Sequence, residues 1–283
     1  MYIGFKHDPD WLPYAPETPG DASTSSDLAV RQFRLPVAAP ALAGKRLLFF
    51  SDLHWANQGR EHRERLITQI NAIAADWIAF GGDLIRFLEF ATAAFGILRE
   101  LRAGLAKLAV LGNRERIHEW FGMDRWHALY REAGFELLVN ETWLDPACTA
   151  ITFTGIDDPR WGHPDLRCAE SAPADRFRVL LTHSPDAVGH TTGQRLGDLV
   201  LAGHTHGGQI RLPLVGALYT SSGYWRQFDR GWRRRQSDGT QLYVTTGVGE
   251  TRYPMLERRI LCPAEFAVFE FVQGAGEAVG CRL

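Results

Sequence analysis

The stretch from Leu199 to Ile210 contains two histidines, His204 and His206, between glycines at the end of an apolar run. The apolar residues up to Ala202 predict a buried strand, and the flanking glycines allow the backbone to turn sharply beside a ligand. In an extended segment, residues i and i+2 face the same side, so both imidazoles can reach one metal cluster. A lone His-x-His more often marks ordinary surface or core histidines. The metal interpretation therefore needs further ligands elsewhere in the chain.

Four other apolar runs, at residues 45–50, 77–80, 108–111 and 177–181, are each followed by polar residues of metal-binding type. In open parallel sheets, functional groups gather beyond the carboxyl ends of the strands, so we expect these side chains to converge. The candidate metal ligands are Asp52, His54, Asp83, Asn113, His183, His204 and His206.

This set contains two carboxylates, one amide oxygen and four imidazoles. Such a mixture suits first-row divalent ions, with manganese as our first choice and iron, zinc or cobalt as alternatives, better than it suits magnesium or calcium alone. One ion cannot use seven ligands. Two ions roughly 3.5 to 4 Å apart, bridged by one carboxylate and a hydroxide, would use them all. The sequence therefore predicts two divalent transition metal ions as cofactors.

The elements between these runs indicate an α/β fold. Apolar residues recur every three or four positions over 61–75, which predicts an amphipathic helix, and a second helical stretch covers about 88–105. Strand, helix, strand, helix, strand is typical of right-handed crossovers in a largely parallel sheet. Farther on, residues 121–138 read as helix and then strand, and Ser184 followed by Pro185 is a good helix start.

The rest of the chain adds strands without a clear linker or internal repeat. Residues 7–27 are rich in Pro, Ser and Asp and predict an irregular strap that Trp11, Leu12 and Tyr14 would pin to the body. Strand-like pieces follow at 30–37, 149–155, 242–245 and 266–271. We expect residues 1–40 to form an N-terminal arm and first strand, and residues 41–283 to form a single domain.

Composition limits the possible partners. The 283 residues are 45% hydrophobic and carry a net charge of −2, which argues against nucleic acid as a partner. The four cysteines are too sparse for a disulfide framework and indicate reduced thiols. No apolar stretch has the length of a membrane-spanning helix, and no signal peptide is recognisable. We expect a cytoplasmic protein with possible peripheral contact to the inner membrane; the oligomeric state is left open.

The polar motifs together resemble the calcineurin-like metallophosphoesterase superfamily. The resemblance is carried by Asp-x-His at 52–54, Gly-Asp at 82–83, Gly-Asn at 112–113, His183 and Gly-His-x-His at 203–206, and it extends over about residues 45–272. The segments GHTHGGQIRLPLVGALYT, DGTQLYVTTGVGE and CPAEFAVFEF further resemble a bacterial subgroup of small membrane-associated or secreted phosphoesterases. The resemblance implies a four-layer α-β-β-α sandwich, in which two mixed sheets are flanked by helices.

The same resemblance implies a role for each candidate ligand. Asp52, His54 and His206 would hold the first metal, and Asp83 would bridge the two metals. The second metal would be held by Asn113, His183 and His204. A hydroxide bridging the metals would attack phosphorus in line, and no covalent enzyme intermediate would be needed.

Two residues depart from the family pattern. The usual motif is Gly-Asn-His, but Arg114 stands in place of the histidine, and arginine cannot donate a proton to a leaving oxygen. Arg114 can instead clamp phosphate oxygens, so we assign it a catalytic and substrate-binding role and expect leaving groups that are weak bases. Arg86 stands where an acid is common and is either a phosphate contact or a surface replacement.

Gly-Asn-Arg also occurs in the UDP-2,3-diacylglucosamine pyrophosphatases of lipid A synthesis, which this chain resembles at that motif. The leading substrate is therefore UDP-2,3-diacylglucosamine, a lipid-linked nucleotide, cleaved to lipid X and UMP. The alternatives are a phosphodiesterase acting on another phosphorylated small molecule, a phosphomonoesterase, and a non-catalytic metal-binding scaffold. A decayed scaffold has no reason to keep seven ligands, and a phosphomonoesterase would need the missing acid.

Aromatic and basic residues alternate after the last candidate ligand. Trp225 and Arg226 lie in this stretch, and we expect them to contact an amphiphilic or anionic substrate or a membrane interface. An ordinary solvated hairpin with aromatic packing explains the pattern equally well. The aromatic residues at 120–126 pose the same question, and His118 could approach the site if a helix begins near Arg114.

Overall fold

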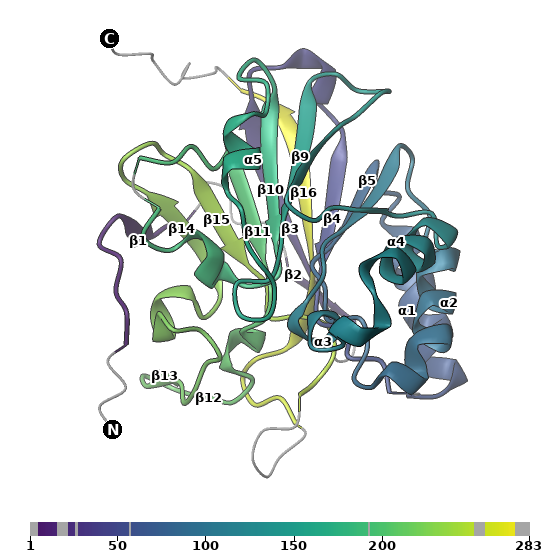
Figure 1. Ribbon diagram of the computed structural model, residues 1–283. Coiled ribbons are helices and arrows are strands. Elements are labelled where there is room, and N and C mark those ends of the chain that lie inside the picture. Colours follow the sequence, from purple (N-terminus) through teal and green to yellow (C-terminus); the bar gives the residue numbers. More distant parts are fainter. Residues whose placement is uncertain are drawn as a thin grey trace.

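Two seven-stranded mixed sheets face each other in the computed structural model, which describes residues 5–15, 22–25, 28–56, 58–191, 193–251 and 258–274 (Figure 1). Sheet I has the order β1 (Trp11–Pro13), β14 (Gly231–Arg235), β15 (Gln241–Val244), β11 (Leu199–Ala202), β10 (Phe177–Thr182), β9 (Ile151–Ile156) and β8 (Glu141–Leu144). Sheet II has the order β2 (Ala22–Ser25), β3 (Leu28–Val37), β16 (Ala264–Gln273), β4 (Arg46–Phe50), β5 (Trp77–Phe80), β6 (Ala106–Ala109) and β7 (Glu136–Leu137).

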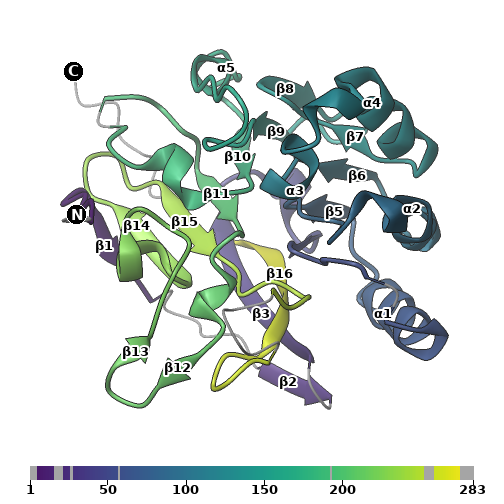
Figure 2. The same ribbon diagram turned by 60° about the horizontal axis from the view of Figure 1, so that its bottom comes forward.

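Helices cover the outer faces of both sheets, which confirms the predicted four-layer α-β-β-α sandwich (Figure 2). The outer layer on sheet II consists of α1 (Arg60–Ala72), α2 (Ala91–Glu100) and α4 (Met123–Glu132). The layer on sheet I is thinner and consists of α5 (Arg167–Glu170) and the 3₁₀ turns η4 (Pro185–Val188) and η6 (Trp225–Phe228). The remaining elements are short: α3 (Asn113–Arg116), η1 (Pro40–Leu42), η2 (Leu88–Phe90), η3 (Glu119–Phe121), η5 (His206–Gly208), β12 (Arg211–Leu212) and β13 (Gly216–Ala217).

Strand β4 shows why its sequence is a continuous apolar run. Its side chains alternate between two cores: Leu47 and Phe49 lie between the sheets, whereas Leu48 and Phe50 pack under the helices of sheet II. All four side chains are buried. A strand covered on both faces must be apolar at every position, so the pattern of period two disappears.

The strands that carry the candidate ligands are parallel neighbours within each sheet. In sheet II, β4 pairs with β5 and β5 with β6, and α1 and α2 form the crossovers between them. In sheet I, β10 pairs in parallel with β11. The carboxyl ends of these five strands therefore reach the same end of the two sheets, where the following loops can meet.

Three local expectations differ from the structure. The helix expected over 88–105 is shorter, because α2 ends at Glu100 and Leu101 is extended. The helix start at Ser184 is present, with the Ser184 hydroxyl accepting a hydrogen bond from the Asp186 N–H, but it begins a 3₁₀ turn. The prediction of an irregular strap over 7–27 is wrong in two places, since β1 pairs with β14 and β2 with β3; residues 16–21 and 26–27 lie outside the described residues.

The expectation that Trp11, Leu12 and Tyr14 pin this segment to the body is confirmed for Trp11 and for Tyr14, whose ring packs edge-on against Trp232, and is wrong for Leu12. Trp11 is buried and its indole N–H donates to the carbonyl of Val188, whereas Leu12 faces solvent. Strand β3 lies inside sheet II, paired in parallel with β16 over ten residue pairs. Among the described helices, none is long and apolar enough to cross a membrane.

Candidate metal centre

Loops after five strands bring all seven predicted ligands to one place. Asp52 and His54 follow β4, Asp83 follows β5, and Asn113 begins α3 just after β6. The sheet I ligands are His183, directly after β10, and His204 and His206, after β11. Asp52, His54, Asp83, His204 and His206 adopt positive φ angles between 44° and 70°. Residues other than glycine rarely adopt this conformation, and such strain is typical of functional sites.

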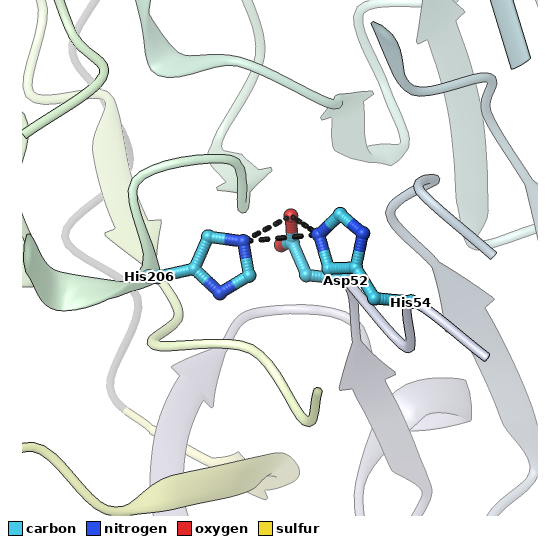
Figure 3. Close-up of side chains that lie close together, drawn as sticks. All are labelled: Asp52, His54 and His206. Atoms are coloured by element: carbon cyan, nitrogen blue, oxygen red, sulfur yellow. Dashed lines mark hydrogen bonds and ion pairs between the residues drawn. The ribbon is translucent and has the colours of Figure 1, made fainter. Parts of the chain in front are cut away.

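Asp52, His54 and His206 form the first group (Figure 3). The Nε2 atoms of the two histidines lie 3.1 Å apart, and Asp52 Oδ1 lies 3.3 Å from His206 Nε2 and 3.7 Å from His54 Nε2. All three residues are buried. Asp52 Oδ1 has no hydrogen-bond partner in the described part of the chain. A buried, unpartnered carboxylate oxygen is costly, and a cation held by these three atoms would remove that cost.

His183 is the centre of the second group. Its Nδ1 lies 2.8 Å from the carbonyl oxygen of Gly81, which only accepts, so this nitrogen carries a proton. Its Nε2 lies 3.1 Å from Asn113 Oδ1 and 3.2 Å from His204 Nδ1. In a neutral ring, the Nε2 lone pair therefore faces the amide oxygen and the second imidazole. This arrangement, in which a second hydrogen bond fixes the tautomer of a ligand, fits a metal site.

Asp83 lies between the two groups. Its Oδ2 is 3.5 Å from His54 Nε2, and its Oδ1 is 3.6 Å from His183 Nε2. Each carboxylate oxygen thus faces a histidine of a different group. This position is compatible with the bridging role predicted for Asp83, and the individual metal-ligand roles remain a prediction.

Hydrogen bonds between the loops hold this arrangement. The N–H of His204 donates to Asp52 Oδ2, and the N–H of Arg114 donates to Asp83 Oδ1. A Cβ on Gly203 would lie 2.4 Å from Asp52 Oδ2, and one on Gly112 would lie 2.2 Å from Asp83 Oδ1. Only glycine allows the backbone to approach the carboxylates this closely.

Glu115 is a residue whose role the sequence analysis missed. It is fully buried, and its carboxylate accepts hydrogen bonds from the N–H groups of Asp83, Leu84 and Gly112. It therefore ties the loop after β5 to the loop after β6. Its place directly after the Gly-Asn-Arg motif was visible in the sequence, but its contacts with residues 83 and 84 were not.

The buried carboxylates and imidazoles of the site shift one another's pKa values. Burial raises the pKa of Asp83 to about 6, with the charges of Glu115 and Asp52 acting in the same direction and those of His183 and His54 opposing. Burial by itself would lower the pKa of His183, but Asp83, Asp52 and Asp158 together raise it to about 9. A metal ion bound at His183 Nε2 would have to displace this proton.

Burial and neighbouring charges also shift the pKa values of Asp52 and His204. Burial would raise the pKa of Asp52, but the neighbouring imidazoles, His206 above all, hold it well below its ordinary value. Burial lowers the pKa of His204 to about 3, and the positive charge of His183 acts in the same direction. Asp52 is therefore available as an anionic ligand and His204 as a neutral one.

Two further residues lie near the cluster: Arg259 gave no signal in the sequence, whereas Asp158 belongs to a turn that follows a strand-like run. Arg259 lies 53 positions after His206, and its Nη2 approaches His206 Nδ1 at 3.5 Å while also donating to the carbonyl of Gly247. Asp158 follows β9, whose end pairs with β10 in register Ile156 to Thr182. Its Oδ1 holds a tight turn by accepting from the N–H groups of Arg160 and Trp161, and its Oδ2 is buried without a partner in the described structure.

The predicted substrate contacts lie at different distances from this centre. Arg114 adjoins it, and its Nε is buried with no hydrogen-bond partner in the described residues. Arg86 lies near the ring of Phe87, and its backbone N–H donates to Trp55. Trp225 packs at a tilted angle against Phe5, and Arg226 Nε donates to the carbonyl of Ala217, so the contacts of both side chains are with residues outside the seven clustered ones.

The chain matches the model of the calcineurin-like phosphoesterases over residues 45–208, which include every one of the seven clustered residues. It is also 34% identical over 233 residues to the uncharacterized metallophosphoesterase YkuE of Bacillus subtilis, an alignment that covers 80% of this chain and 78% of that relative. The chain belongs to the calcineurin-like phosphoesterase family. This calcineurin-like phosphoesterase is therefore a metal-dependent phosphoester hydrolase, and its clustered His and Asp side chains can bind divalent metal.

Other relatives of this calcineurin-like phosphoesterase are more distant. The phosphodiesterase YaeI of Escherichia coli is 28% identical over 244 residues, covering 80% of this chain and 82% of that protein. The crystal structure of a phosphopantetheinyl hydrolase from Mycobacterium tuberculosis aligns with a TM-score of 0.42 and 14% identity, covering 78% of this chain and 97% of that one.

Proposed function

We propose that this phosphoesterase cleaves a phosphodiester or pyrophosphate bond with two divalent ions, manganese being the first choice. The observation that supports the proposal most directly is Asp83, whose two oxygens face His54 in one group and His183 in the other. Two bound divalent ions would supply an activated water and neutralise charge on the phosphoryl oxygens. The chain's own contribution is a buried set of ligand atoms that its loops fix in advance.

Arg114 supports a substrate with a good leaving group. Its backbone N–H is fixed on Asp83 Oδ1, so its side chain begins beside the bridging carboxylate. Its buried Nε has no partner in the described structure, and a phosphoryl oxygen would supply one. A guanidinium stabilises negative charge but does not release a proton at neutral pH. The leaving group must then depart without protonation, as an aryl oxide or a nucleotide phosphate does.

Arg160 offers a second positive charge for the substrate on the side of His204. The positive charge of Arg160 helps to lower the pKa of His204. The backbone N–H of Arg160 donates to Asp158 Oδ1, which holds the turn. Its side chain is exposed at the end of that turn and lies over the ring of Trp161. An anionic leaving group on this side would meet both a cation and an aromatic face.

The relative named phosphodiesterase YaeI supports a diester rather than a monoester. Within this class we propose UDP-2,3-diacylglucosamine as the specific substrate, cleaved to lipid X and UMP. The support for it is Arg114, because the nucleotide phosphate of a pyrophosphate is a leaving group that needs no acid. A phosphodiester of another small molecule satisfies the same site and is the second candidate.

The test uses the full chain stripped with a chelator and reloaded with Mn²⁺. We expect close to two ions per chain and hydrolysis of bis(p-nitrophenyl) phosphate well above that of p-nitrophenyl phosphate. Release of UMP from UDP-2,3-diacylglucosamine would support the specific substrate, and its absence would reject that substrate alone. A protein that binds two ions but hydrolyses none of these compounds would favour the non-catalytic scaffold.

A further inference from the structure

A hairpin projects from the chain immediately after the histidine loop. β12 and β13 form this two-stranded antiparallel hairpin, with Pro213 to Val215 at its tip. Apolar side chains at its tip and just after it face solvent: Leu214 is as exposed as in an extended chain, and half or nearly half of the surface of Leu212, Val215, Leu218 and Tyr219 is accessible. Single exposed apolar residues are normal, but a contiguous group of them marks a surface that contacts something else.

Aromatic and basic side chains continue this apolar surface. Trp225 packs edge-on against Tyr219 and at a tilted angle against Phe5, with the Phe5 and Trp225 ring centroids 4.5 Å apart. Exposed Lys6 and Arg226 are tied to the same region, since the Lys6 N–H donates to Gly223 and the Arg226 side chain donates to Ala217. We call this surface the hairpin face. It comprises Phe5, Lys6, Leu212, Leu214, Val215, Leu218, Tyr219, Trp225 and Arg226.

Two acidic groups near the hairpin face, Asp229 and Asp186, are already paired. Asp229 is buried and binds Arg211 and Arg233. Asp186 accepts hydrogen bonds from Ser222 and Gly223. The cationic side chains of Lys6 and Arg226 therefore stand beside the apolar tip with no carboxylate bound to either among the described residues. An anionic partner surface would complement them.

We propose that the hairpin face docks on the surface of a lipid bilayer that contains anionic lipids. Aliphatic side chains at a convex tip can enter the acyl boundary, aromatic rings such as Trp225 favour the interface, and Lys and Arg contact the head groups. A protein partner would be favoured by a flat or hollowed surface into which its own side chains could pack. The hairpin face is instead a protruding tip.

The hairpin is joined directly to the metal centre. Arg211 Nη1 donates to the carbonyl of Gly207 at 2.8 Å, and Ser221 Oγ donates to the carbonyl of His204 at 2.8 Å. In Figure 1 the hairpin and α3, which begins at Asn113, both lie in the lower part of the view. If the proposed function holds, the bilayer would present the phosphate group of an amphiphilic substrate close to these loops.

The test measures sedimentation of the full chain with vesicles of phosphatidylcholine, with or without phosphatidylglycerol, in the absence of substrate. We expect the protein to bind the anionic vesicles, and the double substitution Leu214→Asp with Val215→Asp to lower the partition coefficient at least about tenfold, since two aliphatic side chains leave the membrane. Arg226→Glu should weaken binding to anionic vesicles more than to neutral ones. The matched control is Leu144→Asp, an equally apolar and half-exposed position on β8 at the edge of sheet I.

The proposal would be overturned if the wild-type chain bound neither kind of vesicle, or if the control variant bound anionic vesicles as weakly as the hairpin variant. It would also be overturned if the chain did not bind vesicles but formed a dimer in sedimentation velocity that Leu214→Asp dissociated. The last result would assign the face to a second copy. Vesicle binding needs no turnover, so a chain that binds vesicles without hydrolysing any phosphodiester would contradict the proposed function and leave the docking surface standing. Circular dichroism of each variant verifies its fold.

Discussion

The metal centre and the hairpin face come from adjacent stretches of chain but are built in opposite ways. His204 and His206 are held by residues far away in the sequence, such as Asp52, which lies 152 positions from His204. Their side chains lie among the other candidate metal ligands, and their backbone adopts positive φ angles, which are rare for residues other than glycine. The hairpin begins five residues after His206 and leaves its apolar side chains in solvent. A catalytic site requires side chains that the fold holds in position before the substrate binds. A docking surface requires apolar side chains that no other part of the fold covers.

The strongest way to separate the two regions is to remove the bridging carboxylate. Asp83→Ala removes the carboxylate whose two oxygens face His54 and His183, so we expect hydrolysis of bis(p-nitrophenyl) phosphate to fall at least about a thousandfold. Vesicle binding should be unchanged. The matched control is Asp124→Ala, an exposed acid at the start of α4, which should retain activity. Residual activity within tenfold of the wild type would contradict the assignment of Asp83.

A subtler change sharpens the chemical side of the comparison. Arg114→His restores a group that can protonate a leaving oxygen, so the rate should depend less on the leaving group. With diesters whose leaving phenols span a range of pKa, the rate on the poorest leaving group relative to the best should rise about tenfold or more. Arg125→His on the exposed face of α4 is the control. Equal changes on all substrates would show that Arg114 has a different role.

The smallest expected effect is a pH dependence of thermal stability that arises from His183 in the metal centre and not from the hairpin face. In metal-free protein, the carboxylates around His183 raise its pKa from an ordinary 6.5 to about 9. A raised folded-state pKa stabilises the fold fully below the ordinary value, and this stabilisation is lost as the pH rises through about 9. We therefore expect the Tm of metal-free protein to fall by several degrees over this interval.

Two comparisons check this origin. Protein loaded with Mn²⁺ should lack the decline, because a coordinated His183 carries no proton on Nε2. His183→Asn should lack it without metal, whereas His127→Asn on α4 should keep it. A decline of equal size in His183→Asn would assign the pH dependence to other groups.

The sequence determined the parts of the molecule that depend on neighbours along the chain. The run before Asp52 had to be a strand buried on both faces, because each of its residues is apolar, and the alternation of strands with helices through residue 111 required parallel crossovers. The ligand types and their places after strands followed from local pattern as well. Together these patterns were enough to predict that the seven side chains converge beyond the ends of the strands. In the structure the seven side chains do lie close together.

Only the tertiary structure decided which distant segments meet. Nothing near Arg259 marks it as a neighbour of His206, and Glu115 could be read as a surface acid until its contacts with three backbone N–H groups were seen. The pairing of β3 with β16 brings together segments more than two hundred residues apart. Local propensity and periodicity show which face of a single helix or strand is apolar. Burial, strand pairing and exposure also depend on which other element packs against that face. For the same reason, the apolar residues around Leu214 could be recognised as exposed only after the core had formed without them.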